Sequence, residues 1–153
     1  MSQPFQVNLD LDGRPVLVVG AGGVAARKVG GLLRAGAHVT VVAPDAVPDI
    51  SEDPDVRWFP RPYQRGELAS YRLGVTATDD PEVNALVAAD GERAGVFVNS
   101  GDDPDNCSVT LPSVARAGDL QVAVSNNGRS PALSAWLRRR IEREIAAGHD
   151  QLL

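Results

Sequence analysis

The sequence of 153 residues has one cysteine, one lysine and no long hydrophobic run. Cys107 cannot form a disulfide within the chain, so we expect a reducing compartment. The longest apolar runs, such as residues 16–19, are far shorter than the roughly 18 residues that a membrane span requires. The N-terminal residues lack the basic and apolar regions of a signal peptide. These absences predict a soluble, cytoplasmic protein with no membrane partner.

Several chemistries are also missing from the sequence. Cys107 has no thiol partner, and the only two histidines, His38 and His149, are far apart, so no zinc-binding set exists and we predict no metal site. We expect His38 to begin a strand, His149 to lie in a frayed tail and Cys107 to pack as a small hydrophobe. A G-x-S-x-G nucleophile elbow and a Walker lysine are absent as well.

The charge balance is acidic, with 15 Lys+Arg against 20 Asp+Glu and a net charge of -5. This balance argues against a general nucleic-acid-binding protein, because such proteins need clustered positive charge. Lys28 is the only lysine, so the other basic residues are all arginines. The arginine excess fits either the composition bias of a GC-rich genome or a need to bind carboxylates and phosphates through two parallel hydrogen bonds.

The first two thirds of the sequence alternate strand and helix signals. A β-branched run at 15–19 predicts a buried strand, and a glycine turn, a helix over 24–35 and a second strand over 38–42 follow. The rhythm continues with strands at 56–59, 73–77 and 95–98 and helices at 65–69 and 80–94. This order predicts an α/β fold of the Rossmann type, a doubly wound parallel sheet with helices on both faces.

The remainder of the chain loses that rhythm. Two strand-like runs, 108–111 and 120–125, precede a helix that Ser130 caps and that runs to about residue 147. We therefore predict a dinucleotide-binding domain over 1–112 and a strand-plus-helix appendage over 113–153. The helix has an apolar face suited to packing on the domain or on a second subunit. Its arginines, 138–140 and 143, suit either the helix dipole or a rim that attracts an anionic substrate.

The glycine turn matches the fingerprint G-x-G-x-x-G/A of a dinucleotide site. Gly20 permits the tight turn, Gly22 lets the backbone approach a pyrophosphate, and Ala25 allows close packing of helix on strand. The helix N-terminus that follows offers free N–H groups to phosphate oxygens. The alternative is a tight turn that holds no ligand.

Two further strand ends supply candidates for the same site. Asp45 is the first acid after the second strand and could reach the ribose hydroxyls, and no arginine stands there for a 2′-phosphate, so we expect NAD rather than NADP. Thr78 and Asp79 follow the 73–77 strand and should line the cofactor crevice. The alternative is that Asp79 or Asp80 only caps the next helix.

The segment 99–106 follows the last strand of the alternating region and carries three carboxylates, Asp102, Asp103 and Asp105. One of them could accept a proton beside a nicotinamide, or they could bind a divalent metal ion. The alternative is a solvated turn, because Asp, Gly and Pro are common in turns.

These motifs together resemble a known family, the precorrin-2 dehydrogenase/sirohydrochlorin ferrochelatase module of siroheme synthase. The resemblance lies in residues 16–42, 77–80, 99–102, 111–113, 122–125 and 130–131. It implies NAD-dependent oxidation of precorrin-2 to sirohydrochlorin, followed in many members by insertion of Fe2+ to give siroheme. The family usually has a further helical segment after the region matched here, so the expectation is weaker for ferrochelatase activity than for dehydrogenation.

The resemblance also implies roles for residues. It places NAD contacts at Gly23, Val24, Pro44 and Asp45, and the family's key aspartate at Asp102, with Asp103 as the second choice. It further implies a homodimer formed through the region after the sheet. The precorrin-2 substrate is a polycarboxylate, so we expect arginines, such as Arg129 or the 138–143 group, to face the cleft that contains Asp102. The alternative function is a nucleotide-sensing Rossmann module that regulates a partner without catalysis.

Overall fold

The computed structural model describes residues 4–101, 103–126 and 129–147. The chain divides into two compact units, which are described one at a time. The larger unit runs from Asn8 to Thr110, and the smaller combines the segment up to Val7 with the segment from Leu111 onward.

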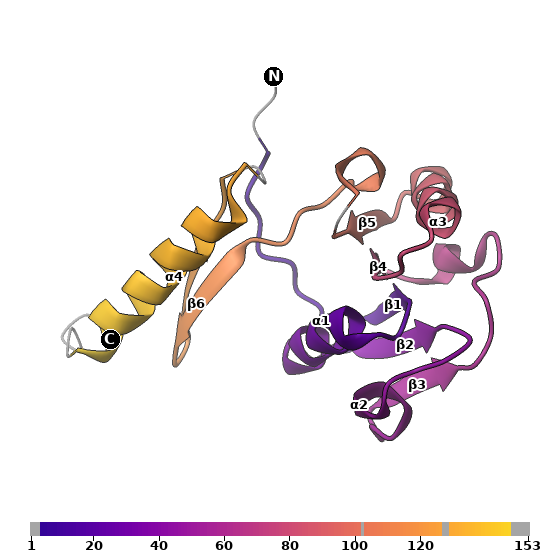
Figure 1. The fold of residues 1–153 in the computed structure, drawn as a ribbon, viewed down its shortest axis with the longest axis horizontal. Coiled ribbons are helices and arrows are strands. Elements are labelled where there is room, and N and C mark those ends of the chain that lie inside the picture. The colour runs from indigo at the N-terminus through magenta and orange to yellow at the C-terminus, as the bar shows by residue number, and fades with distance from the viewer. Residues whose placement is uncertain (1–3, 102, 127–128, 148–153) are drawn as a thin grey trace. The chain divides into compact units, whose positions relative to one another are not determined.

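The larger unit is built on a five-stranded parallel sheet (Figure 1). The strands lie in the order β3-β2-β1-β4-β5, and every neighbouring pair is parallel. The central strands β1 and β4 are almost wholly buried, as their unbroken apolar sequences predict. The strands are β1 (Pro15–Val19), β2 (His38–Val42), β3 (Val56–Phe59), β4 (Leu73–Thr76) and β5 (Phe97–Ser100).

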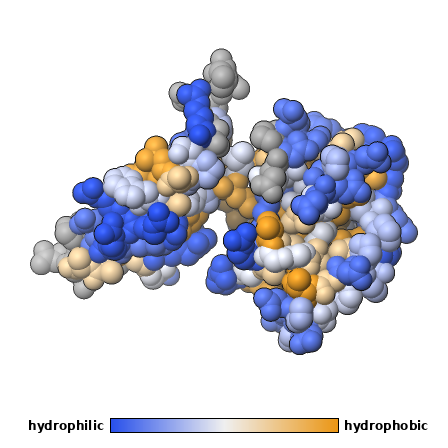
Figure 2. Space-filling model, viewed as in Figure 1, coloured by the Kyte–Doolittle hydropathy of each residue, from blue (hydrophilic) through white to orange (hydrophobic). Residues whose placement is uncertain are grey.

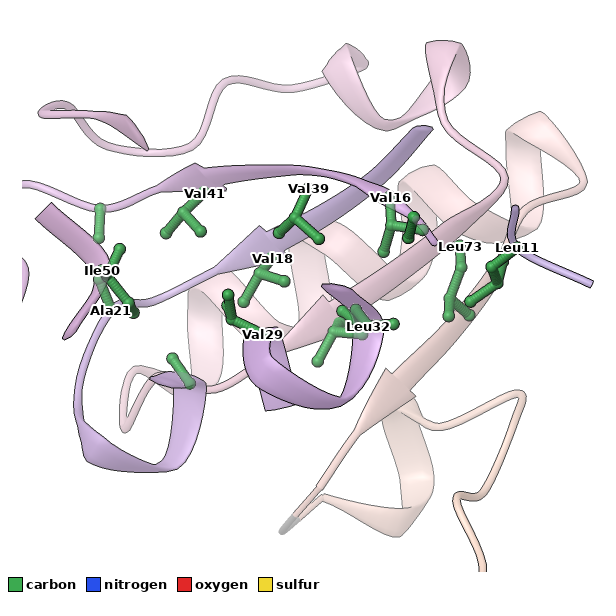
Figure 3. Close-up of a cluster of buried hydrophobic side chains, with 14 residues drawn as sticks. Leu11, Val16, Val18, Ala21, Val29, Leu32, Val39, Val41, Ile50 and Leu73 are labelled. Atoms are coloured by element: carbon green, nitrogen blue, oxygen red, sulfur yellow. The ribbon is translucent and has the colours of Figure 1, made fainter. Parts of the chain in front are cut away.

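Helices cover both faces of this sheet. On one face, α1 (Gly23–Arg34) and α2 (Pro48–Ser51) contribute Val29, Leu32 and Ile50 to a core of buried aliphatic side chains (Figure 3). On the other face, the 3-10 helix η1 (Glu67–Ser70) and α3 (Pro81–Ala94) pack Leu68 and Val87 against a second core. The doubly wound Rossmann-like sheet predicted from the sequence is confirmed.

The strand order places a topological switch point between β1 and β4. The chain leaves β1 toward β2 on one side and returns through β4 on the other, so the loops after these two strands diverge. Ligands of open parallel sheets bind at such a point, outside the carboxyl ends of the strands. The residues that follow β1, β2, β4 and β5 are therefore the candidates for a ligand site.

The smaller unit contains an antiparallel pair and one helix. Strands β6 (Ser113–Ala117) and β7 (Leu120–Val124) form the pair, and α4 (Pro131–Ala146) packs on it. The Ser130 hydroxyl accepts a hydrogen bond from the Leu133 amide and caps α4 as predicted. Figure 2 shows mostly hydrophilic surface on the visible face of the unit that carries α4, with a smaller hydrophobic patch.

Some local predictions were wrong. The expected strand at 108–111 does not form, because the amides of Ser108 and Val109 both donate to the single carbonyl of Val98 instead of entering a ladder. The strand expected at 95–98 begins at Phe97, because Gly95 ends α3 in the left-handed conformation. The division at residues 112 and 113 stays a prediction. Among the described residues, none of the helices combines the length and the apolar character needed to span a bilayer.

A buried carboxylate on α3 fixes the connection between β3 and β4. The Asp90 carboxylate accepts hydrogen bonds of 2.6 Å from the Tyr63 hydroxyl and from the Gly66 amide, and it pairs with Arg93. Burial by itself would raise the pKa of Asp90, but the hydrogen bonds from Gly66, Tyr63 and Arg93 outweigh burial and lower it. Burial and the hydrogen bond to Asp90 raise the pKa of Tyr63. The ionised form of Asp90 therefore stabilises the fold.

We expect Asp90→Ala to lower the free energy of unfolding by about 1–3 kcal/mol at pH 7, because it removes the buried acceptor of the Tyr63 hydroxyl and the Gly66 amide. Since the folded-state pKa is lowered, this stabilisation is present above the ordinary carboxyl pKa of about 4 and disappears as the pH falls through the folded value. Urea denaturation at several pH values measures both effects. Glu92→Ala, at an exposed position on the same helix, is the control. Equal stability of Asp90→Ala and the parent protein at pH 7 would refute this role.

Candidate functional site

The turn between β1 and α1 lies at the switch point of the sheet. Gly20 adopts a positive φ of 101°, and a Cβ atom added there would collide with the carbonyl oxygen of Ala77, the residue after β4. The Gly20 amide also donates to the carbonyl of Val42, and the Ala77 amide donates to that of Val19. The ends of β1, β2 and β4 are thus drawn together at this glycine, which no other residue could replace without strain.

The next two glycines of the turn, Gly22 and Gly23, are not required by the packing of the chain. Gly22 is the N-cap of α1 with an ordinary φ of -84°, and a Cβ added to Gly22 or Gly23 would meet nothing within 4 Å. Both residues are exposed, Val24 is 45% exposed, and no side chain caps the helix. The first turn of α1 is therefore open around these two glycines and has no side-chain cap, as a phosphate-binding helix N-terminus requires. This arrangement fits the predicted pyrophosphate contact.

The end of β2 lies beside this turn. Ala43 is buried and its carbonyl accepts a hydrogen bond from the Trp58 indole, whereas Pro44 and Asp45 are exposed. The Asp45 carboxylate makes no hydrogen bond or ion pair with any described residue. The structure thus brings Pro44 and Asp45 to the carboxyl edge of the sheet with the glycine turn, and leaves the Asp45 carboxylate available to a ligand.

Among the residues after β4, one caps the next helix and its neighbours are left at the edge of the sheet. Asp80 is the N-cap of α3 and accepts hydrogen bonds from the amides of Glu82 and Val83. The Thr78 hydroxyl accepts a hydrogen bond from the Asp80 amide, while the Asp79 side chain is exposed. Capping therefore belongs to Asp80, and Thr78 and Asp79 remain at the carboxyl edge, next to Gly20, as candidates for cofactor contact.

The end of β5 is held by a buried amide. Asn99 is 5% exposed, and its Nδ2 atom donates to the carbonyl of Val109 at 2.9 Å while its Oδ1 atom accepts from Lys28 Nζ of α1 at 2.8 Å. On the adjoining strand, the Thr76 hydroxyl donates to Ser100 Oγ at 2.9 Å, and both residues are buried. These contacts fix both ends of the loop that carries the candidate carboxylates.

Asp102, the leading candidate, lies outside the described residues. Asp103 is half-buried and its carboxylate accepts a 2.6 Å hydrogen bond from the side-chain amide of Asn106, which braces the short 3-10 helix η2 (Pro104–Asn106). Asp105 is exposed. Cys107 is half-buried and its thiol donates to the Val109 carbonyl, so it packs in the loop. No group of three metal-ligating side chains occurs in the part of the chain that the structure describes.

Three arginines of α4, Arg138, Arg140 and Arg143, have partners on their own helix. Arg138 forms an ion pair of 2.6 Å with Glu142, and the guanidinium of Arg140 lies 5.8 Å from the centre of the Trp136 ring. Arg129 is exposed. The expectation that these arginines face the cleft with Asp102 stays a prediction.

Sequence reasoning missed two residues of this edge, Lys28 and Asn99. The sequence places Asn99 at the start of a loop and in a family motif, although an amide directly after a buried strand residue is a signal for a buried hydrogen-bonding role. Lys28 was noted only as the single lysine. The contact between them joins positions 71 residues apart, which a single sequence does not reveal.

Comparisons with known proteins cover most of the chain. A family model described as "Putative NAD(P)-binding" matches residues 7–113, and a model described as "Sirohaem biosynthesis protein central" matches residues 117–144. The chain is 42% identical over 135 residues to siroheme synthase 3 of Aeromonas hydrophila, covering 86% of this chain and 29% of that protein. It is 43% identical over 148 residues to siroheme synthase of Azotobacter vinelandii, covering 94% and 32%. The chain thus spans about a third of the length of these curated relatives.

A solved structure extends the comparison to the whole fold. The structure named SirC, precorrin-2 dehydrogenase, superposes with a TM-score of 0.74 at 30% identity and covers 95% of this chain and 71% of its own. The predicted cofactor, NAD, agrees with the family model, which is described as NAD(P)-binding. The chain belongs to the NAD(P)-binding siroheme synthase and precorrin-2 dehydrogenase family.

Proposed function

We propose that this protein oxidises precorrin-2 to sirohydrochlorin with NAD+ as the electron acceptor. The observation that carries the proposal is the open first turn of α1, where Gly22 and Gly23 have ordinary backbone geometry and empty space above them. Glycines that the fold does not require are explained by a ligand that approaches the backbone closely. The likeness to SirC over 95% of the chain supports the substrate.

Each residue of the carboxyl edge has a proposed role. The amides of the glycine turn and of Val24 bind the pyrophosphate, with the partial positive charge of the helix N-terminus stabilising it. Pro44 and Asp45 hold the adenine-side ribose, and Thr78 and Asp79 line the crevice. NAD+, when bound, supplies a two-electron acceptor. Asp102 takes up the proton that precorrin-2 releases in the oxidation, or orients the substrate for it.

Three further parts of the proposal rest on the family. Insertion of Fe2+ into sirohydrochlorin would follow, with Fe2+ as a substrate. A homodimer would form through the smaller unit, in which Leu133 and Trp136 of α4 are 47% and 46% exposed. The reaction would take place in the cytoplasm, in keeping with a chain that has a single cysteine.

Gly22→Val tests the phosphate cradle. We expect it to weaken NAD+ binding about tenfold or more, because the branched side chain occupies the space above the N–H groups. The change should cost less than about 1 kcal/mol of stability, since only an N-cap preference is lost. Isothermal titration calorimetry with NAD+ and thermal unfolding measure the two effects. Unchanged NAD+ affinity in a folded Gly22→Val protein would contradict the site.

Asp45→Ala tests the choice of cofactor. We expect NAD+ binding to weaken about fivefold and NADP+ binding to improve, because the variant loses a ribose hydrogen bond and also a repulsion of the 2′-phosphate. The ratio of the two dissociation constants is the measurement. Asp49→Ala, which removes an exposed carboxylate from α2, is the matched control. An unchanged ratio in Asp45→Ala would assign Asp45 no part in cofactor selection.

Asp102→Asn tests the reaction itself. We expect kcat for precorrin-2 oxidation to fall by about 10²–10³, while NAD+ affinity stays unchanged, because the amide cannot accept the proton. The absorbance of sirohydrochlorin reports turnover, and adding Fe2+ or Co2+ to sirohydrochlorin reports chelation separately. Full activity of Asp102→Asn would refute its role. Absence of turnover in the unmodified protein would instead favour the alternative, a nucleotide-sensing module without catalysis.

A further inference from the structure

The only lysine of the chain lies at the base of the carboxylate-bearing loop. Lys28 is in the middle of α1 and is half-buried, and its ammonium donates to the side-chain oxygen of Asn99 at 2.8 Å. A Cβ atom added to Gly101 would lie only 2.7 Å from Lys28 Nζ. The ammonium therefore sits between the Asn99 side chain and the backbone of Gly101, the residue that precedes Asp102.

The position of the ammonium is defined by the rest of the Asn99 network. The Asn99 amide nitrogen donates to the Val109 carbonyl, so the Asn99 side-chain oxygen faces Lys28. In this orientation the amide group gives a donor to the carbonyl and an acceptor to the ammonium. Asn99 is almost fully buried and cannot move without breaking both contacts. Lys28 is thus joined through one side chain to both the outgoing and the returning ends of the loop.

The identity of the residue is informative because every other basic residue in the chain is arginine. A guanidinium is broad and planar, whereas an ammonium is a compact charge on a flexible stem. An additional carbon at Gly101 would displace the ammonium from its present position, because Nζ lies close to that glycine. A compact cation beside the backbone therefore suits a lysine better than an arginine at this position.

We propose that Lys28 is a positioning residue for the oxidation, which holds the turn from Asn99 to Gly101 and so sets where the following loop begins. The inference rests on the proposed function and extends it to a residue on a helix that otherwise serves the cofactor. Asp102 follows Gly101 directly in the sequence, so a shift of this turn would shift the start of the carboxylate-bearing loop.

The kinetic test compares Lys28→Met with Arg34→Met. Both variants remove one positive charge from α1, but Arg34 is exposed in the last turn, at the opposite end from the glycine turn. We expect Lys28→Met to lower kcat about tenfold or more, because the loop after Asn99 is no longer held in position. The affinity for NAD+ should stay within about twofold of the parent value, because the glycine turn is unchanged. Arg34→Met should retain the parent kcat. Lys28→Arg should recover only part of the lost rate, because its broader head meets Gly101.

A second measurement does not require turnover. Growth on ¹³C-labelled lysine labels only Lys28, so its Cε signal is resolved in a carbon–proton spectrum. We expect its chemical shift to differ from that of free lysine and to move toward that value in Asn99→Ala. Urea unfolding of the parent protein gives the reference shift.

The outcomes separate the two proposals. A parent-like kcat in Lys28→Met, an equal loss in Arg34→Met, or a loss confined to NAD+ affinity would each overturn the positioning role. A Lys28 signal that Asn99→Ala leaves unchanged would overturn it as well, whatever the activity. Absence of turnover in the parent protein would refute the proposed oxidation, and the role of Lys28 in it, while the ¹³C signal would still decide whether Asn99 holds the ammonium.

Discussion

The close approach of β1 and β4 at Gly20 is the constraint on which the rest of the site depends. With no Cβ at this position, the carbonyl of Ala77 can lie against the backbone of the glycine turn. The carboxyl ends of three strands then meet within one hydrogen-bonded cluster, and α1 starts directly above them. A ligand at this edge is held by backbone groups whose positions the sheet determines, so its binding depends little on flexible side chains.

The candidate groups around Gly20 are held in place by different parts of the structure. The glycine turn and the residues after β2 and β4 follow directly from the sheet. The loop after β5 depends on Asn99, which links β5, α1 and the returning segment at Val109. The proposed cofactor half of the site is thus part of the sheet, whereas the proposed substrate half depends on a single buried amide. A substitution at Asn99 would separate these two halves in a way that no change at the glycine turn could.

Much of this could be predicted from the sequence because the relevant signals are local. The apolar run of β1, the glycines after it and the capping residues Asp80 and Ser130 act within a few positions of themselves. The remainder depends on contacts between distant segments. The bonds of Asp90 to Tyr63 and of Lys28 to Asn99 carry no periodic pattern. The segment 108–111 looked like a strand by composition, but two amides that share the Val98 carbonyl decide its conformation.

The difference between Gly20 and Gly22 has a consequence for how the two positions evolve. Replacement of Gly20 damages the packing of the domain, so selection for a folded protein is enough to keep it. Gly22 has no such protection, because the fold accepts a side chain there. A lineage that ceased to use the nucleotide would keep the first glycine and lose the second by drift. Under the proposed phosphate contact, position 22 would therefore distinguish nucleotide-binding copies of this domain from copies that fold but no longer bind the nucleotide, and position 20 would not.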